Sequence, residues 1–355
     1  MTTPGDFEIG RSVLTGYTAD NELHRALTIL RNEGVNPEVV VEFTAERDGI
    51  FCGISEVKTL LNRVLPETGR EVWALEEGVS VGAGEVGLRI KAPYASFGLF
   101  ETAILGILAS CTGWATAASE CVEAGSGIPV IAYGARHVHP EVVGVMDYSA
   151  VVGKCASSSS VAGHQLHGLT PSGTMPHSFV LLMGDTVRSI LAFDKHMPPE
   201  VPRVALVDTF KDEVEEAVDV AKALRERLRG IRLDTPKERG GVTPDLVHEI
   251  RARLDQGGYS HVDIFVSGGI TPDRIREFVE AQAPVSVFAV GYYIAAASPI
   301  SFTADVKAIE DRAIAKRGRI PGLSANPRLS QVLSLIHISE PTRRYAISYA
   351  VFCLK

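Results

Sequence analysis

Short apolar runs recur along the chain from residue 128 onward, and each gives way to a small polar or glycine-containing cluster. Amphipathic stretches with helical spacing separate most of them. This alternation predicts parallel strands joined by helices, so that the groups following each strand gather at one edge of a sheet or barrel. The runs are Ile128–Tyr133, residues 149–153, Val204–Val207, Ile231, Val262–Val266 and Val285–Val290.

The chain before about residue 115 shows a different pattern, in which helical and strand-like segments alternate less regularly. Apolar spacing predicts helices over Asn21–Glu33 and Gly53–Val64. The β-branched run Val39–Phe43 predicts a strand, and short alternating runs with glycine turns between Glu71 and Ala92 predict a small antiparallel sheet. Residues 1–20 are predicted to be an extended polar segment.

A stretch rich in apolar and small residues, from about Ser96 to Ala124, predicts one long helix that ends at Gly125. Glu101 and several small polar residues interrupt it, so we expect a buried helix rather than a membrane span. The change to regular β/α alternation falls in or just after this helix, which predicts a domain boundary there.

The predicted division is an N-terminal α/β domain in residues 1–120 and a catalytic α/β barrel in residues 121–305, with residues 306–332 returning towards the first domain. The segment Leu333–Lys355 has no cap, turn or periodicity that continues what precedes it, and it resembles the translation of a sequencing-adapter read-through. We expect it to be non-native and the natural C-terminus to be missing. A genuine amphipathic tail is the alternative.

The overall composition limits the classes of partner. A formal net charge of −8 argues against general affinity for nucleic acids. The five cysteines show neither a CxxC pair nor metal-ligand spacing, and no secretory signal precedes them. We therefore expect a soluble cytoplasmic protein with no membrane or nucleic-acid partner and no metal site built by side chains alone.

Two of the polar clusters carry candidate chemistry. Tyr133 and Arg136 follow the first run, and an arginine fork suits phosphate or carboxylate oxygens while a tyrosine ring can cover a flat heterocycle. A surface arginine beside a core tyrosine is the alternative. The segment GTMPHS combines Thr174 and a rigid proline with His177, which predicts an imidazole acting as base or nucleophile. A structural loop histidine is the alternative.

Carboxylates follow two later runs, at Asp208 and Asp234, and Arg232 precedes the second. Carboxylates at strand ends suit ribose hydroxyls or Mg²⁺, and an arginine suits an anionic ring substituent. Capping of the following helices is the alternative for both aspartates.

Glycine-containing turns follow the last two runs. Such turns, where a strand leads to a helix N-terminus, commonly present backbone N–H groups to a phosphate. We predict a phosphate site formed by Ser267, Gly268, Gly269 and Gly291. A tight β/α turn that uses glycine for its backbone conformation alone is the alternative.

Together these segments resemble the nicotinate phosphoribosyltransferase family, in particular its compact archaeal and bacterial branch. The resemblance covers most of residues 10–300 and includes KAPYASFGLFETAILGIL, YGARHVHP, GTMPHS, MPPEVPRVALVDTFKDE, GIRLDTPKERGG and GYSHVDIFVSGGI. It implies an N-terminal α/β sandwich-like domain packed on an irregular α/β barrel, the type II phosphoribosyltransferase fold, in a homodimer that shares active sites. The implied reaction forms nicotinate mononucleotide and pyrophosphate from nicotinate and phosphoribosyl pyrophosphate, with Mg²⁺ and, in many members, ATP.

The resemblance also implies roles for single residues. Tyr133 matches the residue that stacks on the pyridine ring, Arg136 a contact to the diphosphate or ring substituent, and Arg232 a contact to the donor or the nicotinate carboxylate. Asp208 and Asp234 match ribose-side or metal-side carboxylates, and Thr174 lies among the substrate-binding positions. His177 matches the histidine that ATP phosphorylates, and Ser267, Gly268, Gly269 and Gly291 match the nest for the 5′-phosphate.

The run of four serines at residues 157–160, the serine run, predicts whether the pyridine substrate carries an acid or an amide. Related nicotinamide enzymes place an aspartate before a Val-Ala-Gly of this kind, where it accepts from the carboxamide. This chain has Ser159 there, which favours a ring carboxylate.

The chain also departs from the family. Aromatic residues usual after the Thr-Asp pair near residue 20 are absent, so Tyr17 is the candidate to supply an aromatic contact across the dimer. Tyr292-Tyr293 replaces a Thr-Ser pair in the last phosphate turn. Some relatives carry a cysteine-rich metal module at the C-terminus, and Cys353 alone does not provide one.

Three other functions remain as hypotheses from the sequence. A quinolinate-type transferase releases CO₂ and would need further cations for a second ring carboxylate. A nicotinamide-type transferase would need an acceptor for the amide. The third is a catalytically silent protein that binds phosphoribosyl compounds or nucleotides.

Overall fold

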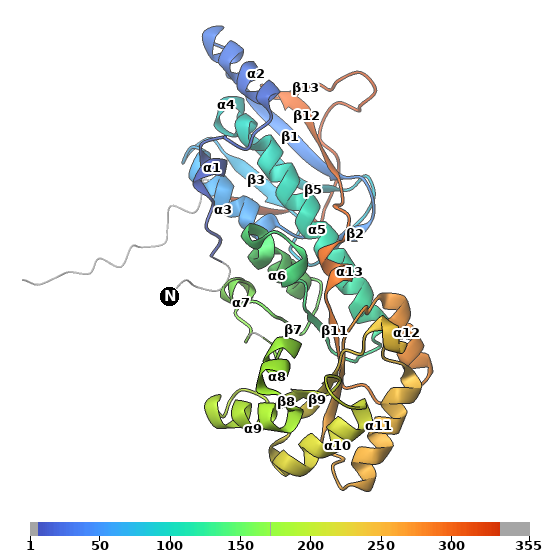
Figure 1. Cartoon of the computed structure of the whole chain (residues 1–355). Coiled ribbons are helices and arrows are strands. Elements are labelled where there is room, and N and C mark those ends of the chain that lie inside the picture. Colours follow the sequence, from blue (N-terminus) through green and yellow to red (C-terminus); the bar gives the residue numbers. More distant parts are fainter. Residues whose placement is uncertain (1–5, 171, 334–355) are drawn as a thin grey trace, which may run out of the picture.

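The structure, a computed structural model, describes residues 6–170 and 172–333 and contains two large sheets that lie in separate halves of the molecule (Figure 1). One sheet takes strands from both ends of the described chain, and the other takes all its strands from the middle. The predicted α/β class is confirmed, with an N-terminal sheet domain and a C-terminal parallel-sheet α/β domain. The domain limits stay predictions.

The N-terminal sheet is built on two long antiparallel strands, β1 (Glu38–Ala45) and β5 (Val86–Pro93). Val41 pairs with Ile90 across these strands, and both are buried, as expected where apolar cross-strand pairs face a core. The other strands are β3 (Glu71–Ala74), β12 (Phe302–Ile309), β13 (Arg312–Ala313) and β14 (Ser330–Leu333), in the order β13-β12-β1-β5-β3-β14. This half also contains α1 (Arg11–Leu14), α2 (Asn21–Asn32), α3 (Ile54–Val64) and the pair β2 (Gly49–Ile50) and β4 (Ser80–Val81).

The C-terminal sheet is wholly parallel and has the order β7-β6-β11-β10-β9-β8. Its outer strands β7 and β8 are not paired with each other in the described structure, yet the segment after β7 reaches the ends of β8 and β9 through contacts of His177 and Met175. The sheet is therefore an open, irregular barrel. Its strands are β6 (Val130–Ala132), β7 (Ser157–Ser158), β8 (Val204–Leu206), β9 (Gly230–Leu233), β10 (Asp263–Val266) and β11 (Val287–Val290).

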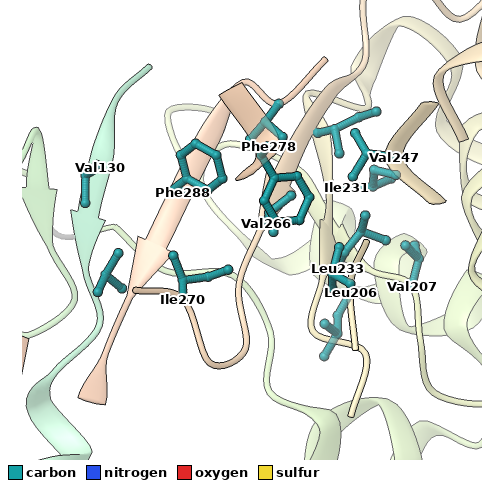
Figure 2. Close-up of a cluster of buried hydrophobic side chains, with 14 of the residues drawn as sticks. Val130, Leu206, Val207, Ile231, Leu233, Val247, Val266, Ile270, Phe278 and Phe288 are labelled. Atoms are coloured by element: carbon teal, nitrogen blue, oxygen red, sulfur yellow. The ribbon is translucent and has the colours of Figure 1, made fainter. Parts of the chain in front are cut away.

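Helices surround this barrel and close its core. Figure 2 shows strand residues such as Ile231, Val266 and Phe288 meeting Val247 and Phe278 from the surrounding helices. Burial of each such side chain stabilises the fold by roughly 1.5–3 kcal/mol. The helices are α6 (Val143–Val152), α7 (Val161–His167), α8 (His177–Met183), α9 (Thr186–His196), α10 (Glu213–Leu224), α11 (Pro244–Gln256), α12 (Pro272–Glu280) and α13 (Tyr292–Ala295).

The long helix α5 (Glu101–Ala124) connects the two halves (Figure 1). Ile104 and Leu108 are buried in the N-terminal core, whereas Ala118 and Cys121 are buried in the barrel core. Within the described residues, Tyr94–Ala124 is the one helical segment long and apolar enough to cross a membrane. Its contribution to both cores accounts for this composition without a membrane.

Several element predictions need correction. The apolar run at 149–153 is the end of helix α6, and the strand lies later, at β7 within the serine run. Met146 and Ala150 are both buried at helical spacing, and a short apolar run does not by itself distinguish a strand from a buried helix. The predicted long helix begins at Glu101, after the short segments α4 (Tyr94–Phe97) and η1 (Gly98–Phe100).

The two ends of the described chain also differ from expectation. The N-terminal segment is not wholly extended, because it contains α1. Leu333, the first residue of the suspected tail, is buried and ends β14, where it pairs with Val72 of β3. Residues 334–355 lie outside the described residues.

Candidate functional site

Two adjoining cavities lie at the carboxyl ends of the barrel strands, with volumes of about 770 Å³ and 320 Å³. Tyr133, Arg136 and Arg232 line both, so the two spaces meet at the ends of β6 and β9. Volumes of this size suit small-molecule ligands. The strand ends are also where β/α folds usually place reactive groups.

The smaller cavity combines an aromatic face with cations and hydroxyls. Ser159 and Thr174, which follow β7, line it together with the three shared residues. The guanidinium carbon of Arg232 lies 6.0 Å from the centre of the Tyr133 ring. The structure thus brings the predicted substrate-binding residues together, apart from Tyr17.

Arg232 is a buried cation that lines both cavities. The side chain is buried, and its Nη2 donates to the Met175 carbonyl oxygen over 3.4 Å. Its buried Nε has no hydrogen-bond partner in the described part of the chain. A buried cation with an unused donor suits an anionic group on a ligand.

His177 and Asp208 form a pair at the neighbouring strand end. His177, the first residue of α8, places its Nε2 3.0 Å from Asp208 Oδ1. The Asp208 side chain is 1% exposed and the His177 side chain 40% exposed. Burial raises the pKa of Asp208, while the charge and hydrogen bond of His177 oppose that rise. Neither residue lines either cavity.

The alternative role of Asp208 and Asp234 as helix caps is wrong. Asp212 caps α10 by accepting from Val214 N–H, and Thr243 caps α11 by accepting from Leu246 N–H. Asp234 instead lines the larger cavity, with its Oδ2 3.9 Å from Arg232 Nη2.

A magnesium ion is compatible with these carboxylates if ligand oxygens complete its shell. The described residues contain no group of three or more His, Cys, Asp or Glu side chains placed to hold a metal ion. Asp208 Oδ2 is buried without a hydrogen-bond partner among them, and Asp234 faces the cavity. Mg²⁺ is commonly held by one or two carboxylates together with phosphate oxygens and water, so this donor set fits.

The predicted phosphate turn follows β10 and lines the larger cavity. Ser267 N–H and Oγ each donate to Leu233 O over 2.9 Å, which anchors the turn to β9. Gly268 and Gly269 follow with φ of 86° and 65°, values that favour glycine. A Cβ on Gly268 would lie 2.8 Å from Asp234 Oδ1, so the absence of a side chain permits close packing. Backbone N–H groups in such a turn can bind an anion.

Gly291 completes the same side of the larger cavity after β11. A Cβ there would lie 2.9 Å from the Tyr133 carbonyl oxygen and 3.3 Å from His137 Nε2. Tyr292 packs edge-on against the His137 ring, with 5.6 Å between ring centroids. Tyr293 donates from its hydroxyl to Glu120 over 2.5 Å. Tyr292 and Tyr293, where the family resemblance predicts a Thr-Ser pair, therefore add aromatic walls to the cavity.

The sequence prediction missed several residues of the larger cavity. Lys237 and His137 stand beside predicted residues in their clusters, so their proximity in sequence was an available signal. Arg47 reaches the cavity from the other domain, where its Nη2 donates to Ser298 O over 3.2 Å. No strand-end pattern marks Arg47. The same cavity is lined along α5 by Gly113, Thr116, Ala117 and Glu120.

Tyr17 is not part of this site within one chain. It is 86% exposed beside α1 and lines neither cavity. Its role across a dimer stays a prediction.

Comparisons with known proteins agree with this architecture. Residues 25–112 match the family described as quinolinate phosphoribosyl transferase, N-terminal domain, and residues 114–305 match its C-terminal domain. A solved structure of nicotinate-nucleotide pyrophosphorylase from Pyrococcus furiosus is 38% identical, with a TM-score of 0.81 over 89% of this chain and 82% of that chain.

Curated relatives carry two kinds of name. Nicotinate phosphoribosyltransferase pncB2 from Mycobacterium tuberculosis is 32% identical over 62% of this chain and 47% of its own length. A probable nicotinate-nucleotide pyrophosphorylase [carboxylating] from Archaeoglobus fulgidus is 24% identical over 75% of this chain and 93% of its own length. The chain thus spans about half the length of the curated nicotinate relatives it matches. From both matched domains and the shared fold, the chain belongs to the quinolinate phosphoribosyl transferase family.

Proposed function

We propose that this protein is a nicotinate phosphoribosyltransferase of NAD salvage, forming nicotinate mononucleotide and pyrophosphate from nicotinate and phosphoribosyl pyrophosphate. The observation that carries the proposal is the pair of adjoining cavities with Tyr133, Arg136 and Arg232 at their junction. The smaller suits a flat anionic ring, and the larger suits a donor with several phosphates. A glycosidic bond between the two ligands would form at the junction.

In this proposal the chain's own groups position the two reactants and balance their charge. Tyr133 covers the pyridine ring and Arg232 faces its carboxylate. The nest at Ser267–Gly269 with Gly291 holds the 5′-phosphate, while Arg136 and Lys237 face the pyrophosphate as it leaves the anomeric carbon. Mg²⁺, held at Asp234 with pyrophosphate oxygens, would neutralise charge on the leaving group.

ATP coupling is the second part of the proposal. Asp208 accepts from His177 Nε2, which leaves Nδ1 as the nitrogen available to attack the γ-phosphorus of ATP. The N–P bond forms as the bond to ADP breaks, and ADP leaves with the electron pair. The resulting phosphohistidine would add acceptor oxygens and negative charge at the barrel mouth.

Quinolinate is the rival substrate, favoured by the family description and by the Pyrococcus furiosus structure. Its second ring carboxylate would have to share Arg136 and Arg232, the arginines that line the smaller cavity. The pair formed by His177 and Asp208 has an assigned role in the nicotinate proposal and none in this rival. For these reasons we favour nicotinate.

The function is tested with the purified chain, Mg²⁺, phosphoribosyl pyrophosphate and each of nicotinate, nicotinamide and quinolinate, with and without ATP. We expect nicotinate mononucleotide from nicotinate, formed faster with ATP, and a much lower turnover of the other two pyridines. Turnover of quinolinate or nicotinamide alone would contradict the substrate assignment. Donor binding by calorimetry without any product would favour a catalytically silent binding protein. We also propose a cytoplasmic homodimer, for which gel filtration with light scattering provides the test of the oligomeric state.

A further inference from the structure

Asp147 is a buried carboxylate beside the smaller cavity that has no part in the chemistry described above. It lies on α6, is 0% exposed and lines neither cavity. Its Oδ2 accepts from Ser160 N–H over 3.1 Å and from Ser160 Oγ–H over 2.5 Å. The same Ser160 hydroxyl accepts from Gly163 N–H over 2.9 Å, so it caps α7 as well. One carboxylate therefore fixes the end of the serine run to the helix that follows.

A second set of hydrogen bonds holds Ser158, the serine that precedes Ser159. Leu169 N–H donates to His167 Nδ1 over 3.0 Å, so the neutral ring carries its proton on Nε2. That Nε2 lies 2.8 Å from Ser158 Oγ and donates to it. Burial raises the pKa of Asp147, and hydrogen bonds from Ser160 and Ser158 oppose that rise. Among the described residues Asp147 Oδ1 is buried without a hydrogen-bond partner in the geometry, so Ser160 is the residue that holds the carboxylate, through Oδ2.

This network does not have the arrangement of a hydrolytic serine site. A catalytic histidine presents a lone pair to the serine hydroxyl, whereas His167 presents a proton to Ser158. Ser158 is also 0% exposed, so a substrate has no access to it. The arrangement positions the backbone instead.

Close packing of α7 against α6 restricts the position of the loop that carries Ser159. A Cβ on Gly163 would lie 2.4 Å from Asp147 Cβ and 2.8 Å from Ser158 Oγ, so α7 lies directly against α6. Ser159 stands between two serines that are both bound to this network, and it lines the smaller cavity.

We propose that Asp147 is a positioning residue that holds Ser159 against the pyridine ring and so sets the preference for a ring carboxylate over a carboxamide. The inference rests on the proposed function, because it concerns the ligand of the smaller cavity. A carboxamide needs an acceptor for its N–H₂ group. The Asp147 carboxylate is buried behind the loop, does not line the cavity and accepts from Ser160 through Oδ2, so it does not meet this need.

The test is the substitution Asp147→Asn, which keeps the volume of the side chain but removes its charge. We expect the KM for nicotinate to rise about tenfold, because a small displacement of a substrate contact is costly, and the KM for phosphoribosyl pyrophosphate to change less than about twofold. The ratio of kcat/KM for nicotinate to that for nicotinamide should fall. Ser160→Ala, which removes one of the two bonds to Asp147, is the milder variant and should shift the same ratio by less.

Asp185→Asn is the matched control, because Asp185 caps α9 by accepting from Arg188 N–H over 2.7 Å and lines neither cavity. An equal rise of both KM values in Asp147→Asn and Ser160→Ala, or no rise at all, would overturn the inference. If Asp147→Asn does not fold, Ser160→Ala alone decides between these outcomes.

Nicotinate affinity measured by calorimetry separates this inference from the proposed function. A wild-type protein that binds nicotinate but forms no mononucleotide would defeat the proposed function. In that case about tenfold weaker nicotinate binding by the two variants would still support Asp147 as a positioning residue, and unchanged binding would refute it.

Discussion

Asp208 Oδ1 lies 3.0 Å from His177 Nε2, and this contact joins the end of β8 to the first residue of α8. The carboxylate is buried while the imidazole is partly exposed. A buried carboxylate that accepts from one ring nitrogen fixes the tautomer and orients the other nitrogen outwards. In the proposed ATP coupling, this pair would present His177 Nδ1 as the nucleophile.

The substitution Asp208→Asn should therefore reduce ATP-dependent phosphorylation of His177 by at least about tenfold, because the amide favours the wrong tautomer. Acid-labile phosphate on the protein after incubation with ATP is the measurement. Asp212→Asn is the control, since Asp212 caps α10 nearby without contacting His177. Full labelling of the Asp208 variant, or of His177→Ala, would remove the proposed role of this pair.

Gly268→Ala should raise the KM for phosphoribosyl pyrophosphate about tenfold or more. The new methyl group would meet Asp234 Oδ1 at 2.8 Å, and the backbone has φ +86°. Backbone strain alone costs roughly 1 kcal/mol. Gly258→Ala is the control, because its φ is +81° and nothing lies within 4 Å of the added Cβ. The phosphate-nest assignment predicts that steady-state kinetics distinguish the two variants even when thermal unfolding does not.

Arg232→Lys should weaken nicotinate binding by about tenfold, because lysine cannot reproduce a planar fork beside an aromatic ring. The guanidinium carbon lies 6.0 Å from the Tyr133 ring centre and the side chain is buried. Arg229→Lys provides the comparison, since Arg229 forms an exposed ion pair with Asp263. Isothermal calorimetry with nicotinate should show a loss for the first variant only. Equal affinity in both would contradict a ring-carboxylate contact at Arg232.

Stability should fall as pH rises from 5 to 8, because burial and the charge of Glu77 raise the pKa of Glu56 to about 7. A raised pKa in the folded state means that the protonated form is favoured there. The resulting stabilisation is present below the ordinary pKa of a glutamate and is lost as pH passes through about 7.

Glu56→Gln is neutral at every pH and should flatten this profile, with a gain of up to about 3 kcal/mol over wild type at pH 8. Chemical denaturation at several pH values measures the difference. Glu67→Gln, at a glutamate on the exposed loop between α3 and β3, is the control. Parallel profiles for wild type and Glu56→Gln would show that Glu56 does not titrate in this range.

The sequence predicted the strand ends well, because apolar runs followed by glycine or charge mark the carboxyl edge of a parallel sheet. Tyr133, Arg232 and Asp234 lie at one cavity for this reason. The run at 149–153 misled, since α6 is also apolar and is buried as a helix. A short apolar run fits a buried strand or a buried helix equally well, so only the packing of this segment shows that it is helical.

Residues that reach the site from a distant part of the chain could not be predicted from the sequence. Arg47 reaches the cavity from a turn in the other domain, and Asp147 contacts the serine loop from a helix that precedes it. Neither stands in a polar cluster after a strand, so only tertiary contacts identify them. The same holds for the partnership of His177 with Asp208, which are 31 residues apart.

The identity of the pyridine substrate is the central claim, and a competition between labelled pyridines tests it most directly. The protein is given equal concentrations of ring-deuterated nicotinate and quinolinate labelled with ¹³C in its C2 carboxylate, together with phosphoribosyl pyrophosphate, Mg²⁺ and ATP. Our account predicts nicotinate mononucleotide that carries the deuterated ring, with no release of ¹³CO₂. Mononucleotide with an undeuterated ring, formed in step with ¹³CO₂, would contradict it.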